Sequence, residues 1–282
     1  MNEILEKLIK KHKFLIASHR GYRAGNIIEN TFLAMKASII CGADIVELDV
    51  SVSRNNDIYV FHDGNEKRLI NKECNISKLT SLEIDKCRYI NNIGNITNYT
   101  PEKLSYILCN LEKIKDQFDF LINIDRSWNY LEIVLDEIEK FNIKSRCIIK
   151  TPLKDKYINI LMKRQYKFMY MALIKTKEDL KMYKKIKNSH ELNIIGIEYS
   201  GNIKDENIVE ILEKDKILWI NSLRLSTDKR LYEEYDDDNS ILGYPNNIGW
   251  LKMVDKGFNV IQTDFPAIVK TVRDMEDNDD RV

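Results

Sequence analysis

The chain has 282 residues, and its 44 basic and 44 acidic side chains give a formal net charge of zero. Hydrophobic residues make up 44% of it, with 10 glycines and 4 prolines, which excludes a disordered, collagen-like or small disulfide-stapled protein. A chain without net charge has no long-range field to attract a polyanion, so we expect no nucleic-acid partner. Any anion-binding site must be local.

The cysteines and the N-terminal segment indicate where the protein resides. The five cysteines are scattered, odd in number and never in a C-x-x-C spacing, which is typical of a reducing compartment and argues against a zinc knuckle. The apolar stretch 14–17 is too short for a signal peptide, and no segment approaches the roughly 18 apolar residues of a membrane span. We predict a cytoplasmic protein without a membrane span; the oligomeric state is not indicated.

Short β-rich runs alternate with longer amphipathic segments, the pattern of a parallel sheet connected by helices. The predicted strands are 14–18, 45–50, 120–124, 146–150, 168–174, 193–198, 217–221 and 259–263. The predicted helices are 30–41, 104–115, 130–140, 155–165, 177–187, 206–215 and 244–256. Eight strands in a chain of this length predict a (β/α)8 TIM barrel. A doubly wound sheet is disfavoured because no G-x-G-x-x-G follows the first strand.

One stretch interrupts this alternation after the second strand. A short apolar run at 57–61 is followed by the polar segment 63–100, which we interpret as an insertion over one barrel end, too short to carry much core of its own. Residues 1–273 then form a single barrel domain, and 274–282 are predicted to be a flexible acidic tail. The acidic run 233–238 is predicted to be a solvated loop.

Reactive groups of such a barrel gather at the carboxyl ends of its strands. Glu47 and Asp49 are two residues apart on a predicted strand, so both point into the barrel mouth if the hydrophobic residues between and beside them face the helices. Carboxylates this close repel each other, which favours a hard divalent cation, and Asp125 could supply a third ligand. The alternative is a metal-free salt bridge from this pair to Arg20 or Lys150.

Two histidines, His19 and His62, directly follow strand-like runs. Histidine titrates near neutral pH, so one neutral and one protonated ring serve as base and acid in a single displacement. Arg20 and Lys150 would supply positive charge for an anionic substrate. These groups favour phosphoryl transfer, and the chain has no G-x-S-x-G, P-loop or H-E-x-x-H motif for a rival chemistry.

Five short motifs occur in a fixed order: His19-Arg20-Gly21, Glu29-Asn30-Thr31, Gly42-Ala43-Asp44, Glu47-x-Asp49-Val50 and His62-Asp63. Their order and spacing resemble the glycerophosphodiester phosphodiesterase family, and the resemblance extends over about residues 14–268. It implies a barrel that hydrolyses a small-molecule phosphodiester to glycerol 3-phosphate and an alcohol. It also implies one divalent cation, Ca or Mg with Mn as a further option.

By this resemblance, Glu47 and Asp49 match metal ligands. His19 and His62 match the catalytic pair, with acid and base unassigned, and Arg20 matches a phosphate contact. The segment 219–221 resembles the family's seventh strand, and Trp219 is assigned to substrate binding.

The third barrel strand departs from the family pattern. Family members commonly read N-I-E-x-K there, whereas this chain has Asp125 in place of the glutamate and Ser127 in place of the lysine. Asp125 therefore resembles a shortened third metal ligand, and Lys150 could replace the missing positive charge. In the Glu29-Asn30-Thr31 motif we expect Asn30 to cap the first helix. Glu29 either reaches the site or orders the loop.

Two rival functions remain open. A lysophospholipase D or sphingomyelinase D-like enzyme would use the same site, but it needs an exposed apolar rim, and residues 63–100 are too polar to predict one. The second alternative is a barrel that binds a phosphorylated polyol but does not hydrolyse it. The changes on the third strand motivate this alternative.

Overall fold

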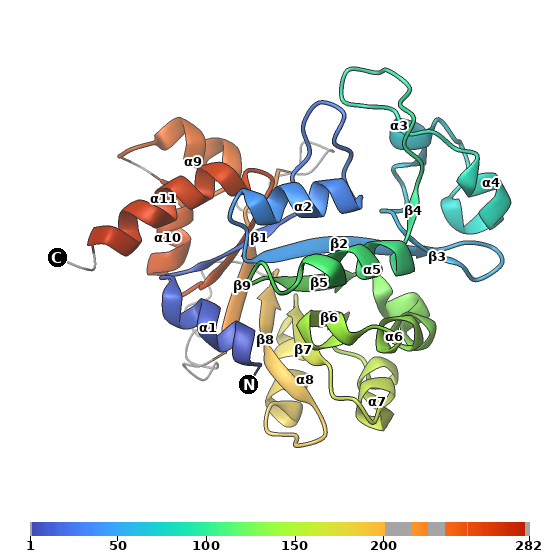
Figure 1. Cartoon of the computed structure of the whole chain (residues 1–282). Helices are drawn as coiled ribbons and strands as arrows, with labels where there is room; N and C mark the ends of the chain where they lie inside the picture. Colours follow the sequence, from blue (N-terminus) through green and yellow to red (C-terminus); the bar gives the residue numbers. More distant parts are fainter. Residues whose placement is uncertain (1, 201–215, 225–234, 247, 280–282) are drawn as a thin grey trace.

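The computed structural model describes residues 2–200, 216–224, 235–246 and 248–279. Its centre is a closed (β/α)8 barrel of parallel strands (Figure 1). The barrel strands are β1 (Leu15–Ser18), β2 (Ile45–Val52), β5 (Leu121–Asp125), β6 (Cys147–Pro152), β7 (Met169–Ile174), β8 (Asn193–Tyr199), β9 (Ile217–Asn221) and β10 (Val260–Thr263). β1 pairs with both β2 and β10, which closes the ring. All eight predicted strands are confirmed.

Helices cover the outside of the barrel. They are α2 (Phe32–Ile40), α5 (Leu104–Ile114), α6 (Leu131–Glu139), α7 (Asp155–Lys163), α8 (Lys177–Ile186), α9 (Asp237–Gly243), α10 (Gly249–Asp255) and α11 (Pro266–Asp279), with 3-10 turns η2 (Ser127–Tyr130) and η3 (Asn142–Arg146). The predicted helix 206–215 lies outside the described residues. The predicted helix 244–256 begins too early, because Tyr244 precedes Pro245 and is extended, as expected before proline. No helix within the described ranges is long and apolar enough to cross a membrane.

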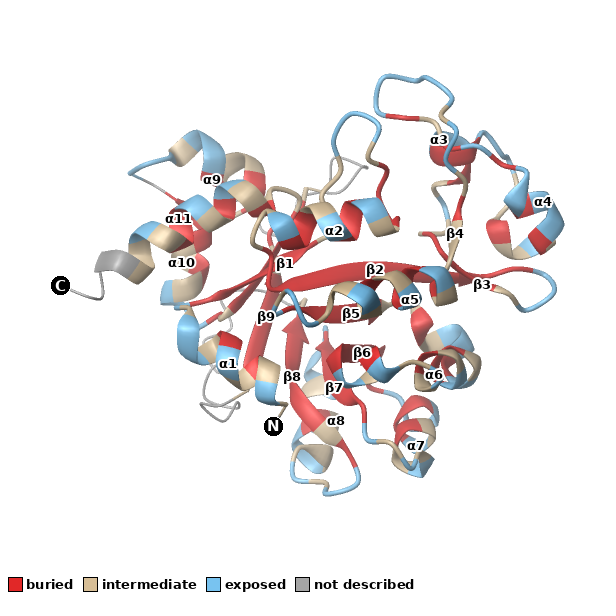
Figure 2. Ribbon diagram, in the orientation of Figure 1, coloured by how far each residue is buried: buried red, intermediate tan, exposed pale blue. Residues whose placement is uncertain are grey.

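The strands separate two layers of apolar side chains. In Figure 2 the ribbons of the barrel strands are coloured mostly as buried. On β2, Val46, Leu48 and Val50 pack outward toward the helices, as predicted. The inner layer includes Ile45 and continues into Leu5 and Leu8 of α1 (Glu3–Lys11), a helix that sequence analysis did not predict. α1 therefore supplies core to the inside of the barrel.

The insertion after β2 lies beyond the end toward which β2 points (Figure 1). It comprises β3 (Ile58–Val60), α3 (Glu66–Ile70), η1 (Ile76–Lys78), α4 (Ser81–Asp85) and β4 (Glu102–Lys103), and β3 pairs antiparallel with β2 and β4. The expectation that it carries little core is wrong, because it packs around a cluster separate from the barrel. That cluster contains Ile28, Tyr59, Phe61, Leu69, Ile70, Ile76, Leu79, Ile84, Cys87 and Tyr89.

The surface of the insertion is less polar than predicted. The side chains of Leu82, Ile93 and Ile96 are 74%, 81% and 76% exposed. Composition alone concealed them because the segment 63–100 as a whole is rich in asparagine, lysine and threonine.

The predicted flexible tail is wrong for residues 274–279, which form the end of α11. Asp277 explains the order: its carboxylate accepts a hydrogen bond from the backbone N–H of Lys13 at 3.0 Å and lies 2.8 Å from Nδ1 of His12. The C-terminal helix is thereby attached to the segment that precedes β1.

A buried ion pair between Arg273 of α11 and Asp44, before β2, strengthens this attachment. Replacing Arg273 by leucine is expected to lower the free energy of unfolding by about 3 kcal/mol or more, because the Asp44 carboxylate stays buried without its cation. Urea denaturation measures the change. The control is Lys270→Ala, whose ion pair with Asp274 is partly exposed, with side chains 41% and 44% accessible, and whose expected cost is below about 1 kcal/mol. If both substitutions lowered the free energy of unfolding by the same amount, burial would not explain the contribution of the Arg273 ion pair.

Candidate active site

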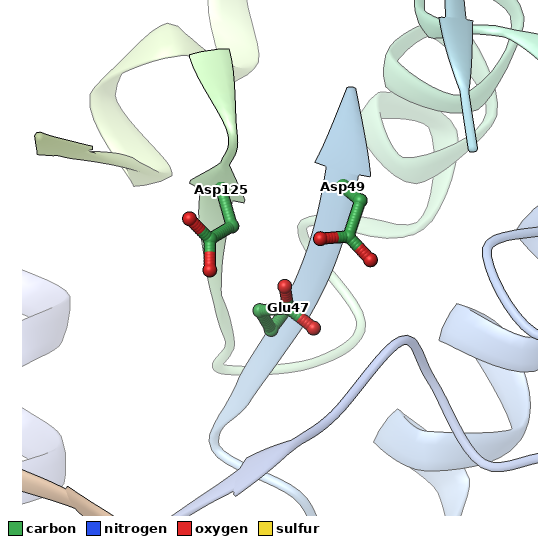
Figure 3. Close-up of side chains that lie close together, drawn as sticks. All are labelled: Glu47, Asp49 and Asp125. Carbon is green, nitrogen blue, oxygen red and sulfur yellow. The ribbon is translucent and has the colours of Figure 1, made fainter. Parts of the chain in front are cut away.

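Three carboxylates meet at the carboxyl ends of two neighbouring strands. Glu47 and Asp49 come from β2 and Asp125 comes from β5, and Asp49 is directly opposite Asp125 in the strand register. Their side chains face one another (Figure 3), and one oxygen of each lies within 4.8 Å of the others. The predicted common direction of Glu47 and Asp49, and the proximity of Asp125, are confirmed.

The electrostatics of this group suit a cation. Burial and the charges of Asp49 and Asp125 raise the pKa of Glu47 well above its usual range, although Lys150 and Arg20 oppose the shift. Next to Glu47 in the register, the amide of Asn123 is buried, and neither of its polar atoms has a hydrogen-bond partner. A buried set of three carboxylates with a spare amide oxygen beside it fits a hard ion such as Ca or Mg, which prefers oxygen ligands.

Arg20 lies directly after β1, and its side chain contacts two carboxylates. Its Nε is 3.0 Å from Oδ2 of Asp49, and a terminal nitrogen donates to Glu29 at 3.0 Å. Its backbone N–H donates to Glu47 at 2.7 Å. Burial disfavours the charged guanidinium, but the three carboxylates prevail and raise its pKa above the ordinary value. Arg20 is therefore a fixed cation of the site, while its contact with phosphate stays a prediction.

Glu29 orders the loop between β1 and α2. Its buried carboxylate accepts hydrogen bonds from Arg20, Arg23 and Arg68. Although burial opposes the shift, the hydrogen bond from Arg68 and the charges of the three arginines lower the pKa of Glu29 to about 2. A carboxylate engaged by three cations serves to hold them in place.

Asn30 does not cap α2, contrary to expectation. Thr31 does, through its Oγ1, which accepts the N–H of Ala34 at 3.2 Å. Asn30 has a left-handed φ of +58°, and its side chain instead donates to Oδ2 of Asp49 and accepts the Asp49 N–H, both at 3.0 Å. Asn30 thus orients a candidate metal ligand, a role that its place in the motif did not reveal.

The two histidines occupy different environments. Nδ1 of His19 lies 2.9 Å from Oδ1 of Asp264, which follows β10. Nδ1 of His62 lies 2.7 Å from the backbone carbonyl oxygen of Asp63. Burial, with the charges of Arg20 and Arg126, lowers the pKa of His62 even though Asp49 acts in the opposite sense. His62 therefore favours the neutral ring, whereas His19 has the carboxylate of Asp264 beside its ring.

Sequence analysis missed Asp237, which supports His19 indirectly. The acidic run predicted as a solvated loop instead begins α9 within its described part, and Asp236 and Asp237 are buried. The carboxylate of Asp237 accepts hydrogen bonds from Ser222 Oγ (2.5 Å), Trp250 Nε1 (2.8 Å), Thr263 Oγ1 (2.8 Å) and the backbone N–H of Asp264 (2.9 Å). It thereby fixes the backbone of the residue that holds His19.

Burial raises the pKa of Asp237 from its ordinary 3.8 to about 7. Between these two values the folded protein keeps a proton that the unfolded chain has released, so the free energy of unfolding falls as the pH rises. From pH 5 to 7, we expect wild type to lose about 2 kcal/mol relative to Asp237→Asn. Denaturant titrations of both proteins at the two pH values measure this. A pH-independent difference would contradict it.

Lys150 and Trp219 are placed differently from their predicted roles. Nζ of Lys150 is buried between Asp125 and Glu198, 2.6 Å from a carboxylate oxygen of each, so it neutralises the cluster; its contact with phosphate stays a prediction. Trp219 is fully buried in the inner core, and its indole N–H is satisfied by Asn221 and Gln262. Its assignment to substrate binding stays a prediction.

Two known proteins are similar to parts of this chain in sequence. A glycerophosphodiester phosphodiesterase from Caldanaerobacter subterraneus subsp. tengcongensis is 30% identical over 145 residues, which cover 49% of this chain and 58% of the relative. A human lysophospholipase D is 39% identical over 77 residues, covering 27% of this chain and 24% of that protein. The chain thus spans a little over half the length of the first relative and a quarter of the second.

Solved structures share the fold at low sequence identity. A glycerophosphoryl diester phosphodiesterase from Parabacteroides distasonis superposes with a TM-score of 0.71 at 19% identity, covering 93% of this chain and 89% of its own. A phosphodiesterase from Oleispira antarctica, in complex with the product sn-glycerol 3-phosphate, gives 0.66 at 12% identity, covering 92% and 96%.

Two family models match overlapping parts of the chain. A domain of unknown function matches residues 168–271. The glycerophosphoryl diester phosphodiesterase family matches residues 19–192, which is more than half of the chain and includes both histidines and all three clustered carboxylates. The protein therefore belongs to the glycerophosphoryl diester phosphodiesterase family.

Proposed function

We propose that the protein hydrolyses glycerophosphodiesters to sn-glycerol 3-phosphate and an alcohol, using a divalent cation. The observation that carries this proposal is the group of three carboxylate oxygens within 4.8 Å at the barrel end where His19 and His62 follow their strands. We place the reaction in the cytoplasm, where the five free cysteines stay reduced.

Glu47, Asp49 and Asp125 would hold the cation, with Ca or Mg favoured by their hard oxygen donors and Mn as a further option. When bound, such an ion withdraws charge from the phosphate and so stabilises the transition state. Asn30 keeps Asp49 oriented by its two hydrogen bonds, and Lys150 keeps Asp125 in place.

The surroundings of the histidines support different roles for them. His62, with its lowered pKa and its Nδ1 directed to a carbonyl oxygen, has a lone pair free at Nε2 and accepts the proton of the nucleophile. The nucleophile is water or the neighbouring glycerol hydroxyl. His19, paired with Asp264, carries the proton that goes to the leaving alkoxide.

The test is the release of sn-glycerol 3-phosphate from glycerophosphocholine, glycerophosphoethanolamine, glycerophosphoinositol and glycerophosphoglycerol. Metal-stripped protein is assayed before and after addition of Ca, Mg or Mn. Turnover that depends on the added ion supports the proposal, and the ranking of substrates identifies the alcohol. Absence of product with every ion and every diester would reject it.

A second candidate substrate is a lysophospholipid, and the exposed Leu82, Ile93 and Ile96 of the insertion favour it. Lysophosphatidylcholine and glycerophosphocholine share a headgroup and differ in the acyl chain, so their comparison isolates the lipid contact. Replacing the three side chains by serine is then expected to lower turnover of lysophosphatidylcholine alone. Equal effects on both substrates would exclude this role.

A further inference from the structure

Two arginines with left-handed backbones flank the strand that carries Glu47 and Asp49. Arg20 follows β1 and Arg126 follows β5; both have a φ of +57°, and β1 and β5 each pair with β2. This conformation is sterically unfavourable for a residue with a side chain, and such residues cluster at functional sites. Arg126 therefore has the same backbone conformation after β5 that Arg20 has after β1.

Arg126 differs from the other cations near the carboxylates in how it is paired. Arg20 and Lys150 each contact two carboxylates, and their side chains are only 12% and 3% exposed. The Arg126 side chain is 34% exposed, and its ion pair among the described residues is with Asp63, at 2.5 Å. Asp63 is itself 37% exposed, so this pair is accessible to a competing anion.

The position of Arg126 connects the candidate metal ligands with a histidine. Its backbone N–H donates to Oδ1 of Asp125 at 2.6 Å, and Asp63, its ion-pair partner, directly follows His62. Arg126 and Asp63 also line a small pocket of about 100 Å³, together with Trp128 and Asn75. Ser127, the next residue in the chain, has only a hydroxyl group, and that group is buried. The positive charge that lines this pocket is therefore that of Arg126.

We propose that Arg126 binds the phosphate group of the substrate, and that the Asp63 carboxylate occupies the guanidinium until phosphate oxygens displace it. Arginine suits this exchange because its planar fork donates two parallel hydrogen bonds to carboxylate and phosphate alike. The inference deepens the proposed function and rests on it for the identity of the substrate. It predicts opposite effects for the two members of one ion pair.

The experiment measures binding of sn-glycerol 3-phosphate and of inorganic phosphate to the Ca-loaded protein by calorimetry. Arg126→Gln is expected to raise Kd by about 10- to 100-fold, the loss of a charged hydrogen bond, and Arg126→Lys to recover part of it. Asp63→Asn is expected to lower Kd several-fold because the competing charge is removed. Arg126→Gly, which also relieves the left-handed backbone, tests the loss of charge in a protein with no new strain.

A structural role for the ion pair predicts a different pattern. In that case Asp63→Asn would weaken binding as much as Arg126→Gln, and this result would overturn the proposal, as would an unchanged Kd in Arg126→Gln. Wild type that binds neither phosphate compound would overturn it as well. Phosphate binding that depends on Arg126, without turnover of any diester, would uphold this inference and reject the hydrolase.

Discussion

Alanine in place of His19 is expected to lower kcat for glycerophosphocholine by about 10³-fold, while a p-nitrophenyl ester of glycerol 3-phosphate keeps most of its turnover. The physical reason is the leaving group. Choline departs as an alkoxide that must receive a proton, and in the proposed mechanism His19, which lies 2.9 Å from Asp264, donates it. p-Nitrophenolate departs without a proton, so losing the acid costs little. Paired kcat measurements on the two substrates check this.

His62→Ala is the matched comparison. If His62 activates the nucleophile, its removal is expected to slow both substrates by similar factors, because both need that activation. The reverse pattern, with the p-nitrophenyl ester spared in His62→Ala and not in His19→Ala, would exchange the two roles. If both variants lowered kcat equally on both substrates, the two histidines would not have separate roles as acid and base.

Glutamine in place of Glu47 is expected to abolish the response to divalent cations and lower kcat by about 10³-fold, since several kcal/mol of charge stabilisation disappear. The same variant should be more stable than wild type when both are metal-free. Glu47 is buried beside Asp49 and Asp125, and their mutual repulsion is removed with its charge. Thermal unfolding with and without added Ca, together with kcat, measures both effects.

Glu198→Gln provides the control for this variant. Glu198 is also buried and bonded to Lys150, yet it lies outside the group of three clustered carboxylates. Its removal should preserve the rise in Tm that Ca produces. If Glu198→Gln lost that rise as completely as Glu47→Gln, the ion would not be held by the three carboxylates of β2 and β5.

The features that sequence analysis predicted correctly depend on local periodicity. The alternation on β2 placed Val46 and Leu48 toward the helices and Glu47 toward the mouth, and strand geometry alone dictates this. The position of a residue at the carboxyl end of its strand can also be read from the local sequence. Asp125 was therefore identified without knowledge of the residues that contact it.

The features that were missed depend on which distant segment covers a residue. Asp237 is in an acidic run typical of a surface, but Trp250 and Thr263 donate hydrogen bonds to it from later elements. Asp277 lies near the end of the chain and is ordered by contacts with residues more than 260 positions earlier. Composition and periodicity carry no record of such contacts, and a single sequence offers no other signal for them.

The separate core of the insertion determines which substitutions this chain can accept without loss of the barrel's packing. Tyr59, Phe61 and Tyr89 belong to a cluster of the insertion that is distinct from the outer core of the barrel. Substitutions on the outer face of the insertion therefore leave the packing of the eight strands undisturbed. Substitutions can therefore remodel this end of the barrel while the carboxylates on β2 and β5 keep their geometry.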